Sequence, residues 1–472
     1  MIKGKTEQLK RVLKPIHLWA IAVGLVISGE YFGWNLGWGV AGTIGLLIAT
    51  LVITVMYITF IFSYTELTTA IPHAGGAFAY AYRAMGPVAG LIAGYATLID
   101  FLFATPAIAL ALGAYLHFLY PAVPVLYSAL FFNVVFIGIN ALGIKESATF
   151  SVFITVLAVA ELLLFMGIVS PHFKMDNFLT HPMPFGWTGI FAALPYAVWF
   201  YLAIEGVAMV AEEVKDPGRN IPKGYISGLA TLVFLALGVM ILTGGITDWR
   251  KLSSLDYPLP EAISIALGKA SNLTRIFTSI GLFGLIASLH GTILASSRQV
   301  FAMARSGYLP RLFSNVNHRF KTPHRAIIIS SVVSFITLFM CDTIWLKDLP
   351  KGFQIGFITY FKCNTSQVIV LSVMGAILMY MMSMISLFRL RIKEPGLKRP
   401  FASPFYPIFP AIALTIAAIT LFAMIYYNFK LSLIFFGGLA AIIGLFMLMG
   451  KHKVKITDDV LLEKAAVMIK SE

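Results

Sequence analysis

The stretch Ile27-Ser-Gly-Glu-Tyr-Phe-Gly-Trp-Asn35 interrupts the first long apolar segment of the chain with a carboxylate and two glycines. A second stretch, Trp199-Phe-Tyr-Leu-Ala-Ile-Glu205-Gly206, places an acid and a glycine at the middle of the sixth apolar segment. Matching interruptions five segments apart predict a transporter with inverted repeats, whose broken helices form the binding site near the bilayer midplane. Two independent helix kinks are the alternative that this pattern leaves open.

The composition indicates a protein whose solvent is lipid. The chain has 472 residues, of which 59% are hydrophobic and only 12% charged, and its mean hydropathy is +0.86. So few charged residues could not cover a surface of this size in water. The net charge of +14 lies in short clusters between apolar segments, as topology signals do, so we expect no nucleic-acid partner.

Twelve apolar segments are long enough, or nearly so, to cross a bilayer. Their approximate ranges are 16–39, 42–70, 87–118, 123–142, 147–170, 186–211, 223–246, 274–304, 324–346, 366–390, 404–427 and 430–449. With both termini cytoplasmic, most of the 35 Lys and Arg residues fall in inner segments. We therefore expect a multi-pass protein of the cytoplasmic (inner) membrane with a retained first span, and a short interfacial helix near 259–268.

Three further stretches carry a family signature. They are Thr65-Glu-Leu-Thr-Thr-Ala-Ile-Pro72-His-Ala-Gly75-Gly76-Ala-Phe-Ala-Tyr80 continuing to Gly86-Pro87, Ala211-Glu-Glu-Val-Lys-Asp-Pro-Gly-Arg-Asn-Ile-Pro222, and Ala295-Ser-Ser-Arg-Gln-Val-Phe-Ala-Met-Ala-Arg-Ser-Gly-Tyr-Leu-Pro310. Together with the broken first span, they resemble the amino acid–polyamine–organocation (APC) superfamily of permeases across nearly the whole chain.

The resemblance implies an all-α polytopic membrane fold of about twelve transmembrane helices, working by alternating access. Its core would be two five-helix inverted repeats of the leucine-transporter type, with helices 1 and 6 broken, followed by two C-terminal helices. The corresponding ranges are a cytoplasmic tail at 1–15, repeats at 16–170 and 186–390, helices 11 and 12 at 404–449, and a cytoplasmic tail at 450–472.

The first break departs from the superfamily pattern. Amino acid permeases of this superfamily carry Gly-Ser-Gly there, and its backbone amides hold the substrate carboxylate. Here the matching residues are Ser28, Gly29 and Glu30. An anionic Glu30 would repel a substrate carboxylate by about 4 kcal/mol at ~4 Å and an effective dielectric of ~20. The sequence therefore predicts a small cation without a carboxylate, and resemblance to the ethanolamine permease branch supplies the name ethanolamine. Alternatively, Glu30 only caps its own half-helix.

Other acids lie at membrane depth, where a charge is costly and often functional. Asp100 and Glu205 are candidates for substrate contact, with structural hydrogen bonds as the alternative. Glu161 is the candidate for proton coupling. Aromatic residues beside the breaks offer an ammonium cage, with packing as the alternative. The expected substrate-binding residues are Ser28, Gly29, Glu30, Tyr31, Phe32, Asp100, Trp199, Tyr201, Ala203, Glu205 and His290.

Two other functions stay open at this point. One is a permease of the same fold for amino acids or other amines, such as choline, polyamines or arginine. The other is an intramembrane enzyme or a sensor, which the absence of HExxH and GxSxG motifs disfavours. The sequence also lacks a GxxxxGK[ST] motif, so ATP is not expected to drive transport.

The expected partners are a small cationic substrate, the lipid bilayer and protons, without a cofactor or metal. The oligomeric state, including a homo-oligomer, is left open. Cys341 and Cys363, both expected on the outer side, are interpreted as two unpaired thiols, with a disulfide between them as the alternative.

Overall fold

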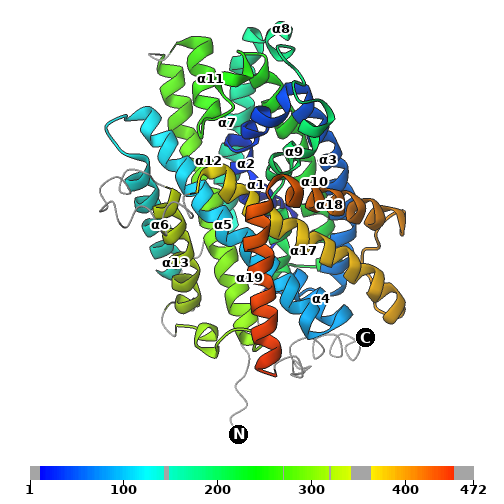
Figure 1. Cartoon of the computed structure of the whole chain (residues 1–472). Coiled ribbons are helices and arrows are strands. Elements are labelled where there is room, and N and C mark those ends of the chain that lie inside the picture. Colours follow the sequence, from blue (N-terminus) through cyan, green and yellow to red (C-terminus); the bar gives the residue numbers. More distant parts are fainter. Residues whose placement is uncertain are drawn as a thin grey trace.

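The computed structural model describes residues 11–142, 148–268, 271–317, 320, 322–341 and 363–450, and within them the chain is helical (Figure 1). Among these residues the only β contact is an isolated parallel bridge between Leu13 and Val214. The predicted tails fall mostly outside the described residues, at 1–10 and 451–472.

Eleven of the described helical segments are long enough and apolar enough to cross a membrane. Their ranges are α3 (Trp38–Ala70), α5 (Pro87–Leu119), α6 (Val125–Leu142), α7 (Ala148–Val169), α9 (Gly186–Trp199) continued by η3 (Ile204–Glu213), α10 (Pro217–Gly244), α12 (Asn272–Arg305), α13 (His324–Cys341), α17 (Thr365–Lys393), α18 (Ile408–Tyr427) and α19 (Phe429–Leu448). The first predicted span is divided into α1 (Pro15–Val26), α2 (Ser28–Tyr31) and η1 (Trp34–Gly37), so no continuous helix represents it. The predicted all-α polytopic fold is confirmed.

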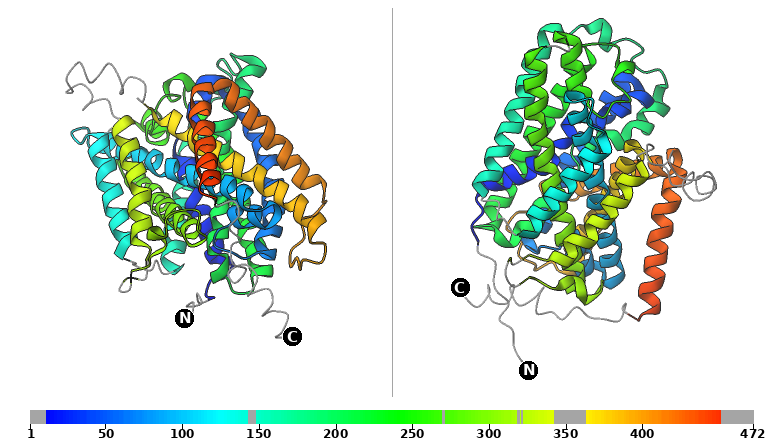
Figure 2. Two further views of the ribbon diagram at one scale, coloured as in Figure 1. Left: turned by 60° about the horizontal axis from the view of Figure 1, so that its bottom comes forward. Right: turned by 90° about the vertical axis from the view of Figure 1, so that its left-hand side faces the viewer.

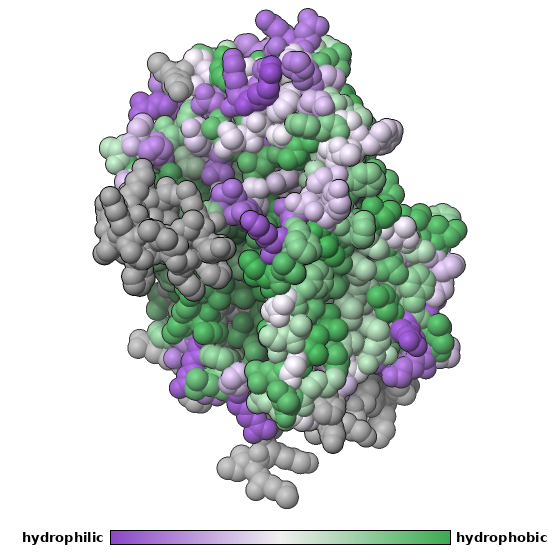
Figure 3. Space-filling view, viewed as in Figure 1, coloured by the Kyte–Doolittle hydropathy of each residue, from purple (hydrophilic) through white to green (hydrophobic). Residues whose placement is uncertain are grey.

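Short helices lie at the two ends of the molecule (Figure 1). At one end are α8 (Met175–Phe178) and α11 (Pro258–Leu267), and α11 corresponds to the predicted interfacial helix. At the other end are α4 (Ala77–Met85) and the C-terminal end of α19, which runs alongside the bundle (Figure 2). On the face drawn in Figure 3, hydrophobic residues cover most of the middle, and hydrophilic residues gather toward the two ends. This distribution suits a protein surrounded by lipid.

The long helix α5 lies at the centre and packs mainly against α17 and α12. Small residues allow the close approach, because a β-carbon on Gly375 of α17 would collide with the carbonyl oxygen of Ala96 in α5. In lipid, helices associate through such close van der Waals packing, since burial of apolar surface gives little advantage there. Asp100, one of the predicted site acids, lies in this closely packed helix α5, whereas Glu205 lies in η3 after the second break.

The two cysteines form a disulfide bond, so the prediction of two unpaired thiols is wrong. Cys341 ends α13 and Cys363 precedes α17, and their Cα atoms lie 4.6 Å apart. The fold brings the end of α13 beside the beginning of α17. A sequence separation of 22 residues does not by itself indicate that proximity.

A buried carboxylate joins α3 to the segment that follows α17. Glu66, which is 1% exposed, binds the Arg391 guanidinium at 2.7 Å and the Arg399 guanidinium at 3.1 Å. The backbone N–H of Ser403 also donates to Glu66, at 2.7 Å. Close by in sequence, Arg83 and Glu394 form a more exposed pair at 2.7 Å. This cluster ties three parts of the chain together at the end that carries α4.

Candidate functional site

The first break is a change of backbone direction between two short helices. α1 ends at Val26, Phe32 is extended, and Gly33 takes the left-handed φ of +90° before η1 begins. A β-carbon on Gly33 would also lie 2.6 Å from the indole nitrogen of Trp199. Glycine is required at this position twice over, by the backbone conformation and by the available space.

The second break lies between α9 and η3, and its backbone is strained. Ala203, buried and not a glycine, adopts the left-handed conformation with φ +78° and ψ +2°. A non-glycine residue in this region costs of order 1 kcal/mol and persists only where surrounding structure enforces it. Tyr201, also buried within this break, is hydrogen-bonded through its hydroxyl to Thr54 of α3 at 2.7 Å.

The two breaks pack directly against each other, as predicted from the sequence pattern. The indole N–H of Trp199 donates to the carbonyl oxygen of Phe32 at 3.0 Å, and the two rings lie edge to face at 5.5 Å. A β-carbon on Gly29 would collide with the carbonyl oxygen of Trp199. Trp34 stacks on Phe200 in the same interface, with ring centroids 5.5 Å apart.

Glu30 lies in this interface without a partner. It is fully buried, and neither of its carboxylate oxygens has a hydrogen-bond partner among the described residues. Tyr31 and Tyr201 are near enough to interact electrostatically with it. A buried carboxylate without a donor is unstable unless it is protonated or receives a cation. The position can therefore accept a positively charged group.

The backbone amide of Ser28 is already engaged. It donates to the hydroxyl oxygen of Ser288 in α12 at 3.1 Å, and Ser288 in turn donates to the carbonyl oxygen of Gly24 at 2.8 Å. The amide of Glu30 donates to the carbonyl oxygen of Ile27 at 3.0 Å. These two amides are thus not free to bind a substrate carboxylate. Ser288 was not among the predicted site residues, and nothing in its local sequence marks it.

A second group of acids joins α5, η3, α17 and α3. The Asp100 and Glu205 side chains are hydrogen-bonded to each other. Ser372 donates to Asp100 Oδ1 at 3.1 Å, and Tyr380 donates to Glu205 Oε2 at 2.9 Å. The hydroxyl of Tyr57 lies 2.9 Å from that of Tyr380. Asp100 and Glu205, predicted separately, are thus brought together by hydroxyl residues that the sequence did not single out.

Glu161 forms a third arrangement on α7. It accepts from the hydroxyl of Tyr31 at 2.6 Å, and the hydroxyl of Tyr115 donates to the Tyr31 carbonyl oxygen at 2.8 Å. The ring of Tyr31 packs over Gly284 of α12, where a β-carbon would lie 2.8 Å from it. Tyr31 therefore turns its hydroxyl toward the proton-coupling candidate.

His290 is not brought together with the breaks. Its ring nitrogen lies 3.0 Å from the Asn140 amide nitrogen, and its ring packs against Phe136, both in α6. Ser288, two residues earlier on α12, faces α1 instead. Residues two apart lie on nearly opposite sides of a helix, which explains the different surroundings.

A polar loop packs against the first break at η1. Asn35 donates to the carbonyl oxygens of Leu252 and Leu255 at 2.7 and 2.8 Å. The adjacent Asp256 accepts from the Thr365 hydroxyl at 3.0 Å. Burial raises the pKa of Asp256 to about 6, although the Thr365 hydrogen bond partly opposes that shift.

The three signature stretches meet at the other end of the molecule. Glu212 accepts from the Ala74 backbone N–H at 3.1 Å, and Glu213 pairs with Arg298 at 3.4 Å. The carbonyl oxygen of Glu213 also accepts from the N–H of Leu13 at 3.1 Å. These contacts hold the three stretches together beside the N-terminal end of α1.

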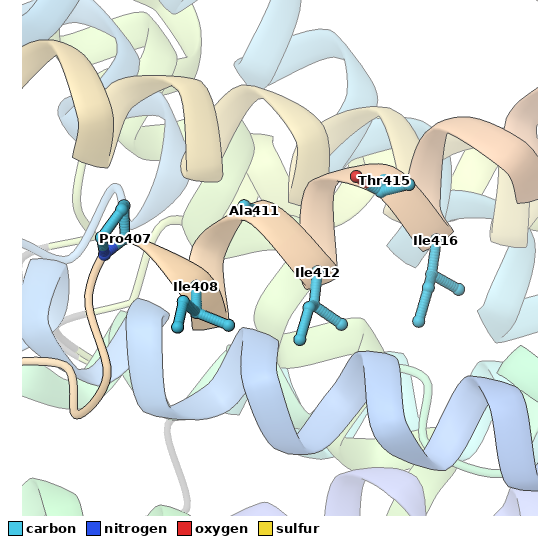
Figure 4. A pocket seen from close by; sticks show the side chains of 6 residues that line it. All are labelled: Pro407, Ile408, Ala411, Ile412, Thr415 and Ile416. Atoms are coloured by element: carbon cyan, nitrogen blue, oxygen red, sulfur yellow. The ribbon is translucent and has the colours of Figure 1, made fainter.

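An apolar groove runs along the exposed face of α18 (Figure 4). Its lining is Pro407, Ile408, Ala411, Ile412, Thr415 and Ile416. It contains no charged group, and Ile408 is 57% exposed, so this surface suits lipid chains better than a polar cargo. Among the described residues, no three His, Cys, Asp or Glu side chains come together as a metal-binding set.

The fold and the buried centre together define a class of protein, a multi-pass carrier in which two broken spans enclose a polar site. Residues 13–450 match the amino acid permease family, and the chain belongs to that family. The predicted membership of the APC superfamily is confirmed, as is the expectation of a transporter and not an enzyme.

The chain is similar to several transporters over most of its length. It is 29% identical to an uncharacterised transporter of Rhizobium meliloti, covering 89% of this chain and 88% of the relative. It is 27% identical to the methylthioribose transporter of Bacillus subtilis, with coverages of 87% and 88%. It is also 25% identical to a branched-chain amino acid permease of the same organism, with coverages of 86% and 87%.

Proposed function

We propose that this permease is a secondary active transporter for ethanolamine or a similar small amine that lacks a carboxylate. The single observation that supports it best is Glu30, a fully buried carboxylate without a hydrogen-bond partner among the described residues, in the first break. A substrate ammonium would supply the missing donor and the missing charge. Phe32 and Trp199, whose rings meet edge to face in the same interface, are the aromatic residues that we assign to the same cation.

The backbone amides favour the same cargo. In the superfamily pattern these amides bind a carboxylate, but here Ser28 donates to a side-chain hydroxyl and Glu30 to a backbone carbonyl. A substrate carboxylate would have to displace these bonds and would also meet the charge of Glu30. The cost of that charge is about 4 kcal/mol at ~4 Å and an effective dielectric of ~20, or more than a hundredfold in affinity.

Transport would proceed by alternating access around the two breaks. We assign residues 16–170 and 186–390 to the two inverted repeats, because each begins with a span that is interrupted near its middle. Gly33 and Ala203, with their left-handed backbone, are the positions where the half-helices can change direction. We also assign both termini to the cytoplasmic side of the cytoplasmic membrane, on the distribution of Lys and Arg.

A second candidate is a permease for amino acids. The names of relatives such as the branched-chain permease favour it. A protonated Glu30 would not repel a carboxylate, and the charge argument would then not apply. Another relative is named for methylthioribose, which has no carboxylate, so the family name alone does not decide between the two cargoes.

Counterflow in proteoliposomes distinguishes them. Vesicles preloaded with ethanolamine should take up labelled ethanolamine, while protein-free vesicles should not. Excess unlabelled ethanolamine should abolish the signal, whereas alanine and arginine should compete weakly, and choline tests how much bulk the site accepts. Complete competition by alanine would refute the carboxylate-free cargo and favour the amino acid permease.

A further inference from the structure

The Asp100–Glu205 pair poses a problem of charge that substrate binding at Glu30 does not solve. The two carboxyl groups are hydrogen-bonded to each other, and Asp100 and Glu205 are 0% and 2% exposed. Two ionised carboxylates cannot form such a bond, because neither has a proton to donate, and their like charges repel strongly in a buried site. One proton must therefore lie between them.

The remaining hydrogen bonds indicate where the proton lies. Ser372 donates to Asp100 Oδ1, and Tyr380 donates to Glu205 Oε2. The two oxygens without a donor are Asp100 Oδ2 and Glu205 Oε1, one on each residue. An Asp100 hydroxyl donating to Glu205 satisfies both oxygens. A phenol is a stronger hydrogen-bond donor than an aliphatic alcohol, so Tyr380 stabilises the carboxylate form of Glu205 more than Ser372 stabilises that of Asp100, and the proton belongs on Asp100.

Within the described part of the chain, no cationic side chain neutralises the pair. No ion pair formed by the described residues includes either acid. The titratable groups that interact with the pair are tyrosines from three surrounding helices, Tyr57 and Tyr64 of α3, Tyr225 of α10 and Tyr380 of α17. Hydroxyl groups of this kind donate hydrogen bonds without supplying a positive charge. A proton is thus the compensating cation.

The pair also joins two groups of helices. Asp100 belongs to α5, which packs mainly against α17 and α12, whereas η3 packs mainly against α1. A movement of the broken span relative to α5 would separate the two acids and end the shared hydrogen bond. Both would then meet water or a ligand, and Asp100 would be free to release its proton.

We propose that Asp100 and Glu205 form a proton-binding site that must hold one proton for the closed state, and that a proton gradient drives amine transport through it. This inference rests on the proposed function for its transport readout, but the proton site itself does not. During opening, the Asp100 O–H bond breaks and the proton passes to water, leaving a carboxylate. During closing, a proton from water restores it.

The test compares Asp100→Asn with the wild type in two transport modes. The asparagine side chain can donate an N–H to Glu205 but cannot release a proton, so closure should no longer require one. Counterflow of labelled ethanolamine should persist. Accumulation driven by an inward gradient of one pH unit, which can reach about tenfold for one proton per substrate, should fall to about onefold. Asp176→Asn, the same change at an exposed position of the short helix α8, should behave as the wild type in both modes.

Infrared spectroscopy of the purified protein separates this proposal from the proposed function. Asp100→Asn should remove the carbonyl band of one protonated carboxyl group, and Glu205→Gln should shift that band by changing its acceptor. These spectra are informative even if ethanolamine counterflow fails. Accumulation by Asp100→Asn that equals the wild type, or a protonated-carboxyl band unchanged by both variants, would overturn the proton site.

Discussion

Replacement of Glu30 by Gln tests the central contact, because it removes the charge while keeping nearly the same shape. In the wild type, both carboxylate oxygens are buried and lack partners among the described residues. The glutamine side chain would still offer a carbonyl oxygen to an ammonium, but without a negative charge. The free energy lost is therefore the charge-assisted part of the contact.

The size of that loss can be bounded. A hydrogen bond to a charged group contributes about 1.5–3 kcal/mol net, which is roughly tenfold to 150-fold in affinity. Whereas binding should weaken, the free energy of unfolding should rise or stay the same. The substitution removes a buried charge whose desolvation is uncompensated in the empty protein, so the free energy of unfolding should not fall.

Binding and stability should be measured on the same purified samples. Equilibrium binding of labelled ethanolamine should weaken at least tenfold in Glu30→Gln, while the melting temperature without ligand stays at or above that of the wild type. Glu261→Gln, the same chemical change in the short helix α11, should alter neither quantity. Unchanged affinity with unchanged stability would reduce Glu30 to a helix cap and refute the charge argument.

Three further predictions concern stability, each measured by thermal unfolding in detergent. Gly33→Ala should cost about 2–4 kcal/mol from backbone strain and collision with the facing indole, while Gly138→Ala, where no atom lies within 4 Å, should be neutral or slightly stabilising; equal effects would refute this. Glu66→Gln should cost about 3–5 kcal/mol by leaving two guanidinium groups without their carboxylate, and Glu394→Gln, in a more exposed pair, under ~1 kcal/mol. Because the folded pKa of Asp256 is about 6 and its reference value 3.8, the folded state favours the proton. The contribution of Asp256 to the free energy of unfolding should therefore be largest below pH 4, fall by up to about 3 kcal/mol as the pH rises through 6 and stay level above that, whereas a D256N variant should lack this part of the pH dependence.

The positions of the spans could be predicted because lipid imposes a simple requirement on sequence. A segment that crosses the bilayer must be long and apolar, and an acid beside a glycine in its middle is a strong local exception. The boundary predicted between the first two spans, at 39–42, coincides with Gly42, which interrupts the helical backbone of α3 with φ +71°. The breaks and their mutual contact followed from such signals.

The partners of the acids could not be predicted, because they come from helices far apart in sequence. Ser372 and Tyr380 lie more than 170 residues from the acids to which they donate. A serine or tyrosine in an apolar span carries no local mark that separates a hydrogen bond to an acid from ordinary packing. The direction of Tyr31 and the disulfide between Cys341 and Cys363 depend on the same tertiary information.

The buried acids impose one electrical condition on the closed carrier. Glu30, Asp100 and Glu205 are at most 2% exposed, and among the described residues no Lys or Arg pairs with any of them. Carboxylates moved from water into such surroundings are costly unless positive charge accompanies them. On our two proposals that charge enters from outside, as an ammonium at Glu30 and a proton between the other two acids. A carrier that closes readily only when the ammonium and the proton are both bound would not close in the substrate-free form, in which these acids are ionised. The preference for a positively charged substrate and the coupling to protons would then have one cause, which is the free-energy cost of closing a site that contains only negative charges.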